Sequence, residues 1–177
     1  MNPLLETLSI AYQYPQAGSV RRLFAGLKDL PKSPAKAHLE RFAQALSHLT
    51  LSEHEELYTR TLDLTPLTAP YVGYAVYGED YRRGSLMAVL NRAMIEAGID
   101  LAGELPDHLS LVLRYLAVVP EPLPELLQIL PPALKQIEHT LQTLEPANPY
   151  LDLLEATQEA VAAYVNARPP IQAGPGR

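Results

Sequence analysis

The sequence contains no cysteine among its 177 residues. This absence excludes a disulfide framework, a thiolate metal site and a cysteine nucleophile. It also fits a reducing compartment, and we expect a cytoplasmic protein. The first residues, MNPLLETLSIAYQYPQ, include no Lys or Arg. They therefore lack the basic first region of a secretory signal peptide, and we expect them to be part of the fold.

Positive charge and long apolar runs are also scarce. The chain has 14 Lys and Arg against 20 Asp and Glu, which gives a formal net charge of -6. Nucleic acid is therefore not an expected partner, because phosphate binding requires a basic face. No apolar run approaches the ~18 residues of a membrane-spanning helix, so no membrane insertion is expected. The length predicts one domain over residues 1–167, followed by a flexible Pro/Gly-rich tail over 168–177.

Leucine and alanine dominate the sequence, whereas valine, isoleucine and phenylalanine are uncommon. This composition favours helices over strands. The apolar residues recur at intervals of three and four, which predicts amphipathic helices. We therefore expect an all-α bundle of about eight or nine helices with a loop over 64–77. The helices are expected near residues 3–14, 19–29, 34–50, 53–63, 78–97, 107–119, 122–130, 132–144 and 149–167.

Local signals mark where several of these helices begin and end. Three dipeptides join a capping side chain to a proline that suits the first helical position: Asn2-Pro3, Ser33-Pro34 and Asn148-Pro149. Ser52 and Glu55 have the spacing of a capping box. Pro131 and Pro132 predict a break or kink within the 122–144 region, because proline removes a helical hydrogen bond and clashes with the preceding turn.

Sequence patterns of common catalytic sites are missing. The five histidines include no pair spaced four apart, and His54-Glu55 lacks the second histidine of a zinc-protease helix. Gly84-Ser85 is followed by Leu86, so it is not a nucleophile elbow. There is no glycine-rich phosphate loop. We therefore predict no catalytic residue, no metal ligand and no bound cofactor.

The stretch from 63 to 84, DLTPLTAPYVGYAVYGEDYRRG, carries tyrosines at intervals of three or four residues. Two interpretations stay open: a tyrosine-rich corner of the core, or a recognition surface whose rigid rings bind a partner segment. Glycines 73, 78 and 84 allow other groups to approach the backbone closely. Arg82-Arg83 is interpreted as a solvated helix face.

The stretch from 103 to 116, GELPDHLSLVLRYL, places an Asp and a His before an apolar run. Asp107 is predicted to be the N-cap of a helix that is apolar nearly all round and therefore central in the bundle. His108 would then lie in the first turn. A proton-transfer dyad needs a third partner and a pocket, and the sequence shows neither. A cap, a binding surface and a dyad all remain possible interpretations, with the cap favoured.

Together these stretches resemble the NarJ family, the assembly chaperones of respiratory nitrate reductase, within the wider TorD-like group of redox-enzyme maturation chaperones. The matching segments are DLTP, PYVGYAVYGEDYRRG and GELPDHLSLVLRYLA, and the resemblance is strongest over 57–117. The wider group often has a tryptophan in the tyrosine region, and this chain has none.

The resemblance implies an all-α, non-enzymatic, cytoplasmic chaperone that acts as a monomer or homodimer. It implies binding to the N-terminal peptide of the catalytic (alpha) subunit of nitrate reductase until the molybdenum cofactor is inserted, before membrane attachment. Proteins that deliver the cofactor are further expected partners. Other molybdoenzymes, of the DMSO, selenate or chlorate reductase type, are alternative clients, and a general helical adaptor is an alternative function. The implied peptide-binding residues are Tyr71, Tyr74, Tyr77, Tyr81, Glu104, Pro106, Asp107 and His108.

Overall fold

The computed structural model describes residues 1–168, and within them it contains nine α-helices, one π-helical turn and no strand. The predicted all-α fold is confirmed. The helices are α1 (Pro3–Ala11), α2 (Ser19–Lys28), α3 (Pro34–Ser47), α4 (Leu51–Tyr58), η1 (Thr59–Asp63), α5 (Val72–Tyr77), α6 (Tyr81–Glu96), α7 (Leu109–Val118), α8 (Pro124–Leu144) and α9 (Tyr150–Asn166). The expected tail falls almost wholly on 169–177, which lie outside the described residues. None of the helices described has the length and apolarity needed to cross a membrane.

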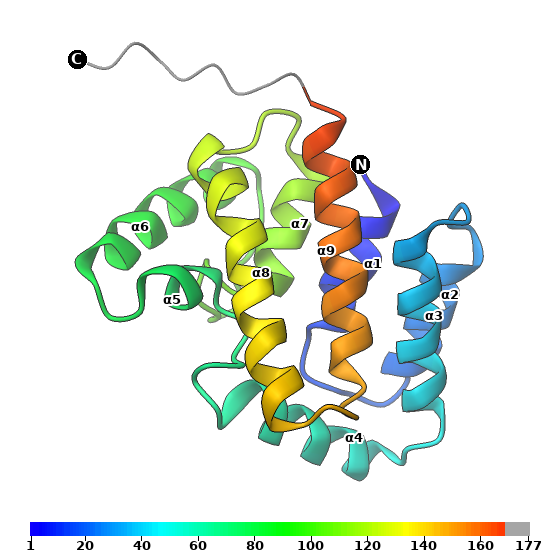
Figure 1. Ribbon diagram of the computed structural model, residues 1–177. Helices are drawn as coiled ribbons and strands as arrows, with labels where there is room; N and C mark the ends of the chain where they lie inside the picture. The colour runs from blue at the N-terminus through cyan, green and yellow to red at the C-terminus, as the bar shows by residue number, and fades with distance from the viewer. Residues whose placement is uncertain (169–177) are drawn as a thin grey trace, which may run out of the picture.

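The helices pack around α9 and α7 (Figure 1). α9 lies against α3 on one side and against α8 on the other, while α7 packs on α1. The short α5 contacts α8 and α6. α5 and α6 lie on the opposite side of the bundle from α3 (Figure 1). One cluster of buried apolar residues extends through all of these layers.

α7 is the central helix, as its sequence predicts. Eight of its ten residues are buried. Its polar backbone groups are also used by neighbouring helices: Ser9 donates its hydroxyl to the Ser110 carbonyl at 2.7 Å, and Tyr164 donates to the Leu116 carbonyl at 2.9 Å. These bonds fix α1 and α9 against α7, because a buried hydroxyl needs a partner.

The capping predictions are partly confirmed. The Asn2 side chain accepts the amides of Leu4 and Leu5, and Ser33 accepts the amide of Lys36. The capping box of α4 is formed by Thr50 and Glu53, so the prediction of Ser52 and Glu55 is wrong. The Glu53 carboxylate accepts the Thr50 amide at 2.7 Å, and α4 therefore begins two residues earlier than expected.

Two boundary predictions are wrong for the same reason, which is that packing overrides local propensity. α5 lies inside the expected 64–77 loop, where its buried Val72 packs into the core. α8 continues from 124 to 144 through Pro131 and Pro132 without a break. Its long buried face presses on the core on both sides of the prolines, and this burial offsets the lost backbone hydrogen bonds.

Candidate peptide-binding site

The two motifs singled out in the sequence meet at an isolated antiparallel bridge between Tyr71 and His108. The Val72 amide donates to the Asp107 carbonyl at 2.9 Å, and the Leu109 amide donates to the Pro70 carbonyl at 2.7 Å. We call segments 70–74 and 104–108, with the side chains that join them, the junction. It aligns the start of α5 with the start of α7.

Tyr71 links the two segments through its side chain. Its hydroxyl donates to Glu104 Oε1 at 2.9 Å, and its ring meets the His108 ring edge-on with centroids 5.1 Å apart. Burial raises the pKa of Tyr71, and the Glu104 carboxylate raises it further. The hydroxyl is therefore a stable donor at neutral pH. The same Glu104 oxygen also accepts the Leu105 amide at 2.8 Å. This bond fixes the carboxylate at the partly exposed edge of the junction, which we call the rim.

Asp107 is fully buried and does not cap α7, so that prediction is wrong. Its carboxylate instead accepts Arg83 Nε at 2.9 Å. The Arg83 guanidinium also lies 5.4 Å from the centre of the Tyr74 ring and 5.7 Å from that of Tyr71. A carboxylate removed from water needs a cation, and α6 supplies it. Arg83 is thus part of the junction rather than of a solvated face.

Of the three glycines in the tyrosine-rich stretch, Gly73 is the one at which close approach is required. A Cβ atom there would lie 2.7 Å from Asp107 Oδ2 and 3.1 Å from Arg83 Cγ. Nothing lies within 4 Å of a Cβ built at Gly78 or Gly84, so the expectation of close approach is wrong for these two. Gly78 has a positive φ of 58°, which gives it a separate reason to be glycine.

His108 is the N-cap of α7, the role that the sequence assigned to Asp107. Its Nδ1 accepts the Ser110 amide at 3.2 Å and contacts the Ser110 hydroxyl at 2.7 Å. Burial lowers the pKa of His108, while Glu104 and Asp107 act in the opposite direction. A neutral ring agrees with an Nδ1 that accepts. Because His108 is engaged with Ser110 and Asp107 with Arg83, the two do not form a proton-transfer dyad.

The remaining predicted residues are not all brought to the junction. Pro106 is buried within it. Tyr77 turns toward α8, where its hydroxyl donates to Glu125 at 3.3 Å and Arg82 covers its ring. Tyr81 begins α6 and is 81% exposed. Arg82 pairs with Asp80 at the surface, as expected of a solvated helix face.

A pocket of about 530 Å³ opens beside the junction. It lies between the end of α1, η1, the 100–104 loop and the start of α7, and it includes Glu104 and His108. Burial raises the pKa of Asp63 in this pocket, and the nearby Glu104 charge adds to the rise. No sequence pattern marks Asp63 as a site residue, although it begins the DLTP segment. Other lining residues that no sequence pattern marks include Tyr12, Tyr14, Tyr58 and Arg114.

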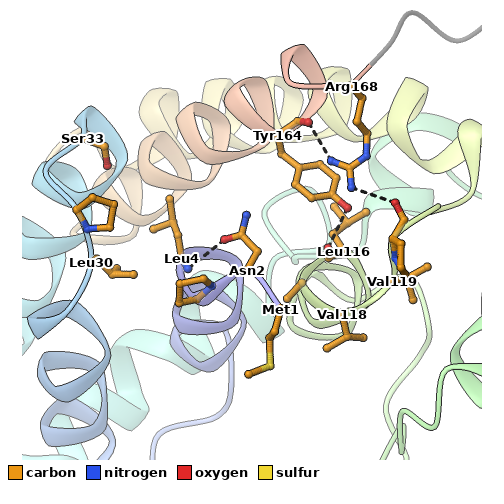
Figure 2. Close-up of a pocket in the computed structure, with 14 residues that line it drawn as sticks. Met1, Asn2, Leu4, Leu30, Ser33, Leu116, Val118, Val119, Tyr164 and Arg168 are labelled. Atoms are coloured by element: carbon orange, nitrogen blue, oxygen red, sulfur yellow. Dashed lines mark hydrogen bonds between the residues drawn. The ribbon is translucent and has the colours of Figure 1, made fainter.

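A second pocket, of about 610 Å³, lies at the opposite end of α7, between the start of α1 and the ends of α7 and α9 (Figure 2). Tyr164 and Arg168 form part of its wall, where Arg168 donates to the Tyr164 carbonyl at 3.0 Å. None of the predicted binding residues lines it. The predicted site is therefore the junction and its adjoining pocket.

Comparison with known families identifies the group to which this chain belongs. Residues 28–146 match the family described as Nitrate reductase delta subunit. The chain belongs to this family. The matched region contains both segments of the junction together with Asp63 and Arg83, so the resemblance seen in the sequence is confirmed.

Two curated relatives extend the comparison. The chain is 32% identical over 124 residues to the nitrate reductase molybdenum cofactor assembly chaperone NarJ of Escherichia coli strain K12. It has the same identity over the same length to NarJ of Escherichia coli O157:H7. In each case the alignment covers 66% of this chain and 52% of the relative. The chain thus spans about half the length of the curated relatives that it matches.

Proposed function

We propose that the protein is an assembly chaperone of respiratory nitrate reductase. It binds the N-terminal segment of the catalytic alpha subunit in the cytoplasm and holds that subunit competent for molybdenum cofactor insertion before membrane attachment. One observation carries the proposal: the family match covers the two motifs that meet at the junction. The two NarJ relatives are nitrate reductase molybdenum cofactor assembly chaperones, which supports the same role.

The junction and pocket have the chemistry to hold a peptide. Tyrosine rings and Leu111 offer apolar area to the apolar face of a partner helix. Burial raises the pKa of Asp63, and the negative charge of Glu104 raises it further, so two carboxylates repel each other here. A basic side chain or the free amine of the client relieves this repulsion. We therefore assign apolar anchoring to the rings and orientation of the peptide to the carboxylates.

The buried part of the junction has a different task, which is to keep the rim rigid. Arg83 and Asp107 fasten α6 to the segment that carries Glu104 and His108. A rigid surface loses less conformational entropy when it binds. Since its polar groups are engaged with one another, the junction is suited to binding rather than to proton transfer, in agreement with a chaperone that is not an enzyme.

Calorimetric titration with a synthetic N-terminal peptide of the alpha subunit tests the proposal. We expect Glu104→Gln to weaken binding by about tenfold to a hundredfold, because a hydrogen bond to a charged group contributes about 1.5–3 kcal/mol. Tyr71→Phe, which frees Glu104 from its hydroxyl partner, should weaken binding less. Glu159→Gln, at an exposed position on α9, is the matched control and should bind as the wild type does.

Equal peptide affinity in correctly folded wild type and Glu104→Gln would remove the rim from the binding site. The client is tested in the same assay with N-terminal peptides of DMSO, selenate and chlorate reductase catalytic subunits. The proposal expects the nitrate reductase peptide to bind most tightly. Tighter binding of one of the others would reassign the client while keeping the site.

A further inference from the structure

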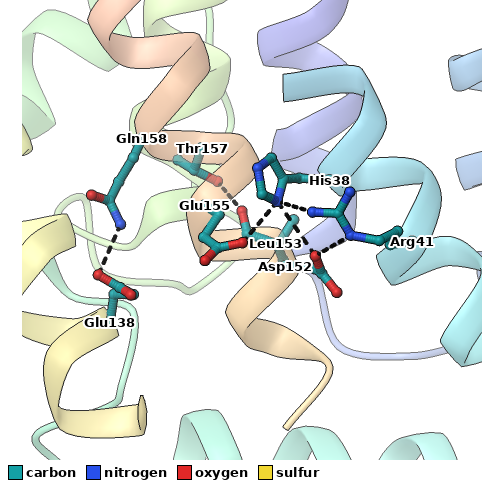
Figure 3. Close-up of polar contacts among 8 residues, drawn as sticks. All are labelled: His38, Arg41, Glu138, Asp152, Leu153, Glu155, Thr157 and Gln158. Carbon is teal, nitrogen blue, oxygen red and sulfur yellow. Dashed lines mark hydrogen bonds and ion pairs between the residues drawn. The ribbon is translucent and has the colours of Figure 1, made fainter. Parts of the chain in front are cut away.

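A cluster of ionisable side chains joins α3 to α9 (Figure 3). His38 Nδ1 lies 2.7 Å from Glu155 Oε2 and 3.4 Å from Asp152 Oδ1. One ligand atom from each of these residues lies within 4.8 Å of the other two. The side chains are 23%, 29% and 44% exposed for His38, Asp152 and Glu155, so an ion from solution can reach them.

The hydrogen-bonding roles in this cluster conflict at one atom. Arg41 Nη2 also contacts His38 Nδ1, and a guanidinium can only donate. A hydrogen bond from Arg41 would require a lone pair on Nδ1. The Glu155 carboxylate at 2.7 Å can only accept, so toward Glu155 the same Nδ1 must carry a hydrogen. A single nitrogen cannot satisfy both neighbours, whereas a metal ion on its lone pair satisfies the nitrogen and both carboxylates together.

We propose that His38, Asp152 and Glu155 form a binding site for a divalent transition metal of the zinc class. One imidazole and two carboxylates suit such an ion. Ligand atoms around tetrahedral zinc are separated by about 3.3 Å, from bond lengths near 2.0–2.2 Å. The 3.4 Å separation already fits, and a small rotation of the half-exposed Glu155 adjusts the 2.7 Å one. Three protein ligands leave a fourth position for water.

Arg41 acts against this metal. Its Nε donates to Asp152 Oδ1 at 2.9 Å and its positive charge occupies the space that the ion needs. Its side chain is 54% exposed, so it can turn into solvent when an ion enters. Removing Arg41 should therefore strengthen metal binding, whereas a cluster of ion pairs alone would only lose contacts.

Metal binding at this position would couple to the stability of the bundle. The histidine and Asp152 are 114 positions apart in the chain, so the ligand set exists only when α3 is packed on α9. An ion that binds only the folded state stabilises it. This separation also explains why the spacing of histidines in the sequence predicts no metal site.

The test combines calorimetric titration of zinc chloride with thermal unfolding. We expect zinc, and not magnesium, to raise the midpoint of unfolding by roughly 5 °C or more at about 100 times its Kd. His38→Ala and Glu155→Gln should weaken zinc binding at least tenfold, and Arg41→Gln should tighten it severalfold. His139→Ala, which removes an exposed histidine on α8, is the matched control and should not change binding.

Circular dichroism of each variant checks that it is folded, and Glu155→Gln keeps the shape of the side chain it replaces. Zinc affinity that is the same in wild type, His38→Ala and Glu155→Gln would overturn the proposal, since the ion would then be held elsewhere. Absence of zinc binding at millimolar concentration, or weaker binding in Arg41→Gln, would also overturn it.

Discussion

The junction and the α3–α9 interface are both buried, yet different kinds of interaction hold them together. The interface joins two long helices through apolar side chains, with Phe42 edge-on to Tyr150 at 5.0 Å between ring centroids. The junction joins short segments through a buried ion pair, a capping histidine and a tyrosine–carboxylate hydrogen bond. Apolar burial stabilises in proportion to area, whereas a buried ion pair contributes little net stability and fixes geometry. The interface thus stabilises the bundle, whereas the junction holds the segment that carries Glu104 and His108 in a fixed position.

The interface should show the largest effect on stability and none on binding. We expect Phe42→Ala to lower the free energy of unfolding by about 4 kcal/mol, because it removes a fully buried ring and leaves a cavity. Urea unfolding measures this loss. In the fraction that remains folded, peptide affinity should equal that of the wild type. A loss of affinity there would mean that the two regions are coupled.

Removing the cation of the junction should affect both properties. Arg83→Met leaves the fully buried Asp107 carboxylate without a partner, and we expect a loss of about 3 kcal/mol in unfolding free energy. Peptide binding should fall because the segment that carries Glu104 and His108 loses its anchor. The double variant with Asp107→Asn provides the control: its loss should be smaller than the sum of the two single losses. Additive losses would show that the pair does not interact.

Two glycines provide a matched pair. Gly73→Ala places a Cβ 2.7 Å from Asp107 Oδ2, and we expect about 2 kcal/mol of destabilisation from this overpacking. Gly84→Ala meets open space within α6, and should stabilise by roughly 0.5–1 kcal/mol through helix propensity. Thermal unfolding of both variants measures the difference. Equal effects at both positions would contradict the close packing of Gly73 on the ion pair.

The smallest effect concerns pH. Burial holds the pKa of His108 below its ordinary value of 6.5, so protonation favours the unfolded chain. The stability that neutral His108 contributes is fully present above pH 6.5 and is lost as the pH falls below it. His108→Asn keeps a capping acceptor and does not titrate. Unfolding free energy should therefore fall less between pH 7.5 and pH 5 in this variant than in the wild type, and an identical fall would contradict the prediction.

The sequence predicts the interface better than the junction for a physical reason. The stripe of Leu39, Phe42 and Leu46 follows the helical period, and all three residues are buried in α3. Periodicity is a local signal, so it reveals which face is buried. The pairing of Arg83 with Asp107 spans 24 positions and depends on the path of the chain between them. No local pattern reports such a contact, and the sequence therefore predicts a solvated Arg83.

The cap of α7 shows the same limit on a smaller scale. Asp107 and His108 both have side chains that accept a helix amide, and residue preference alone favours Asp107. The structure reverses the choice because Asp107 is occupied by Arg83, which leaves His108 to accept the Ser110 amide. The motif thus predicts which segment caps α7. Which residue of that segment is the cap depends on Arg83, a residue from another helix.

Amide hydrogen exchange with and without the client peptide tests the central claim that the junction is the binding surface. We expect the N-terminal peptide of the alpha subunit to slow amide exchange in residues 71–77 and 100–111. The exchange rates of α3 and α9 should not change. Protection confined to α3 and α9, or to the pocket at the end of α9, would contradict the assignment of the junction as the site where the client is held.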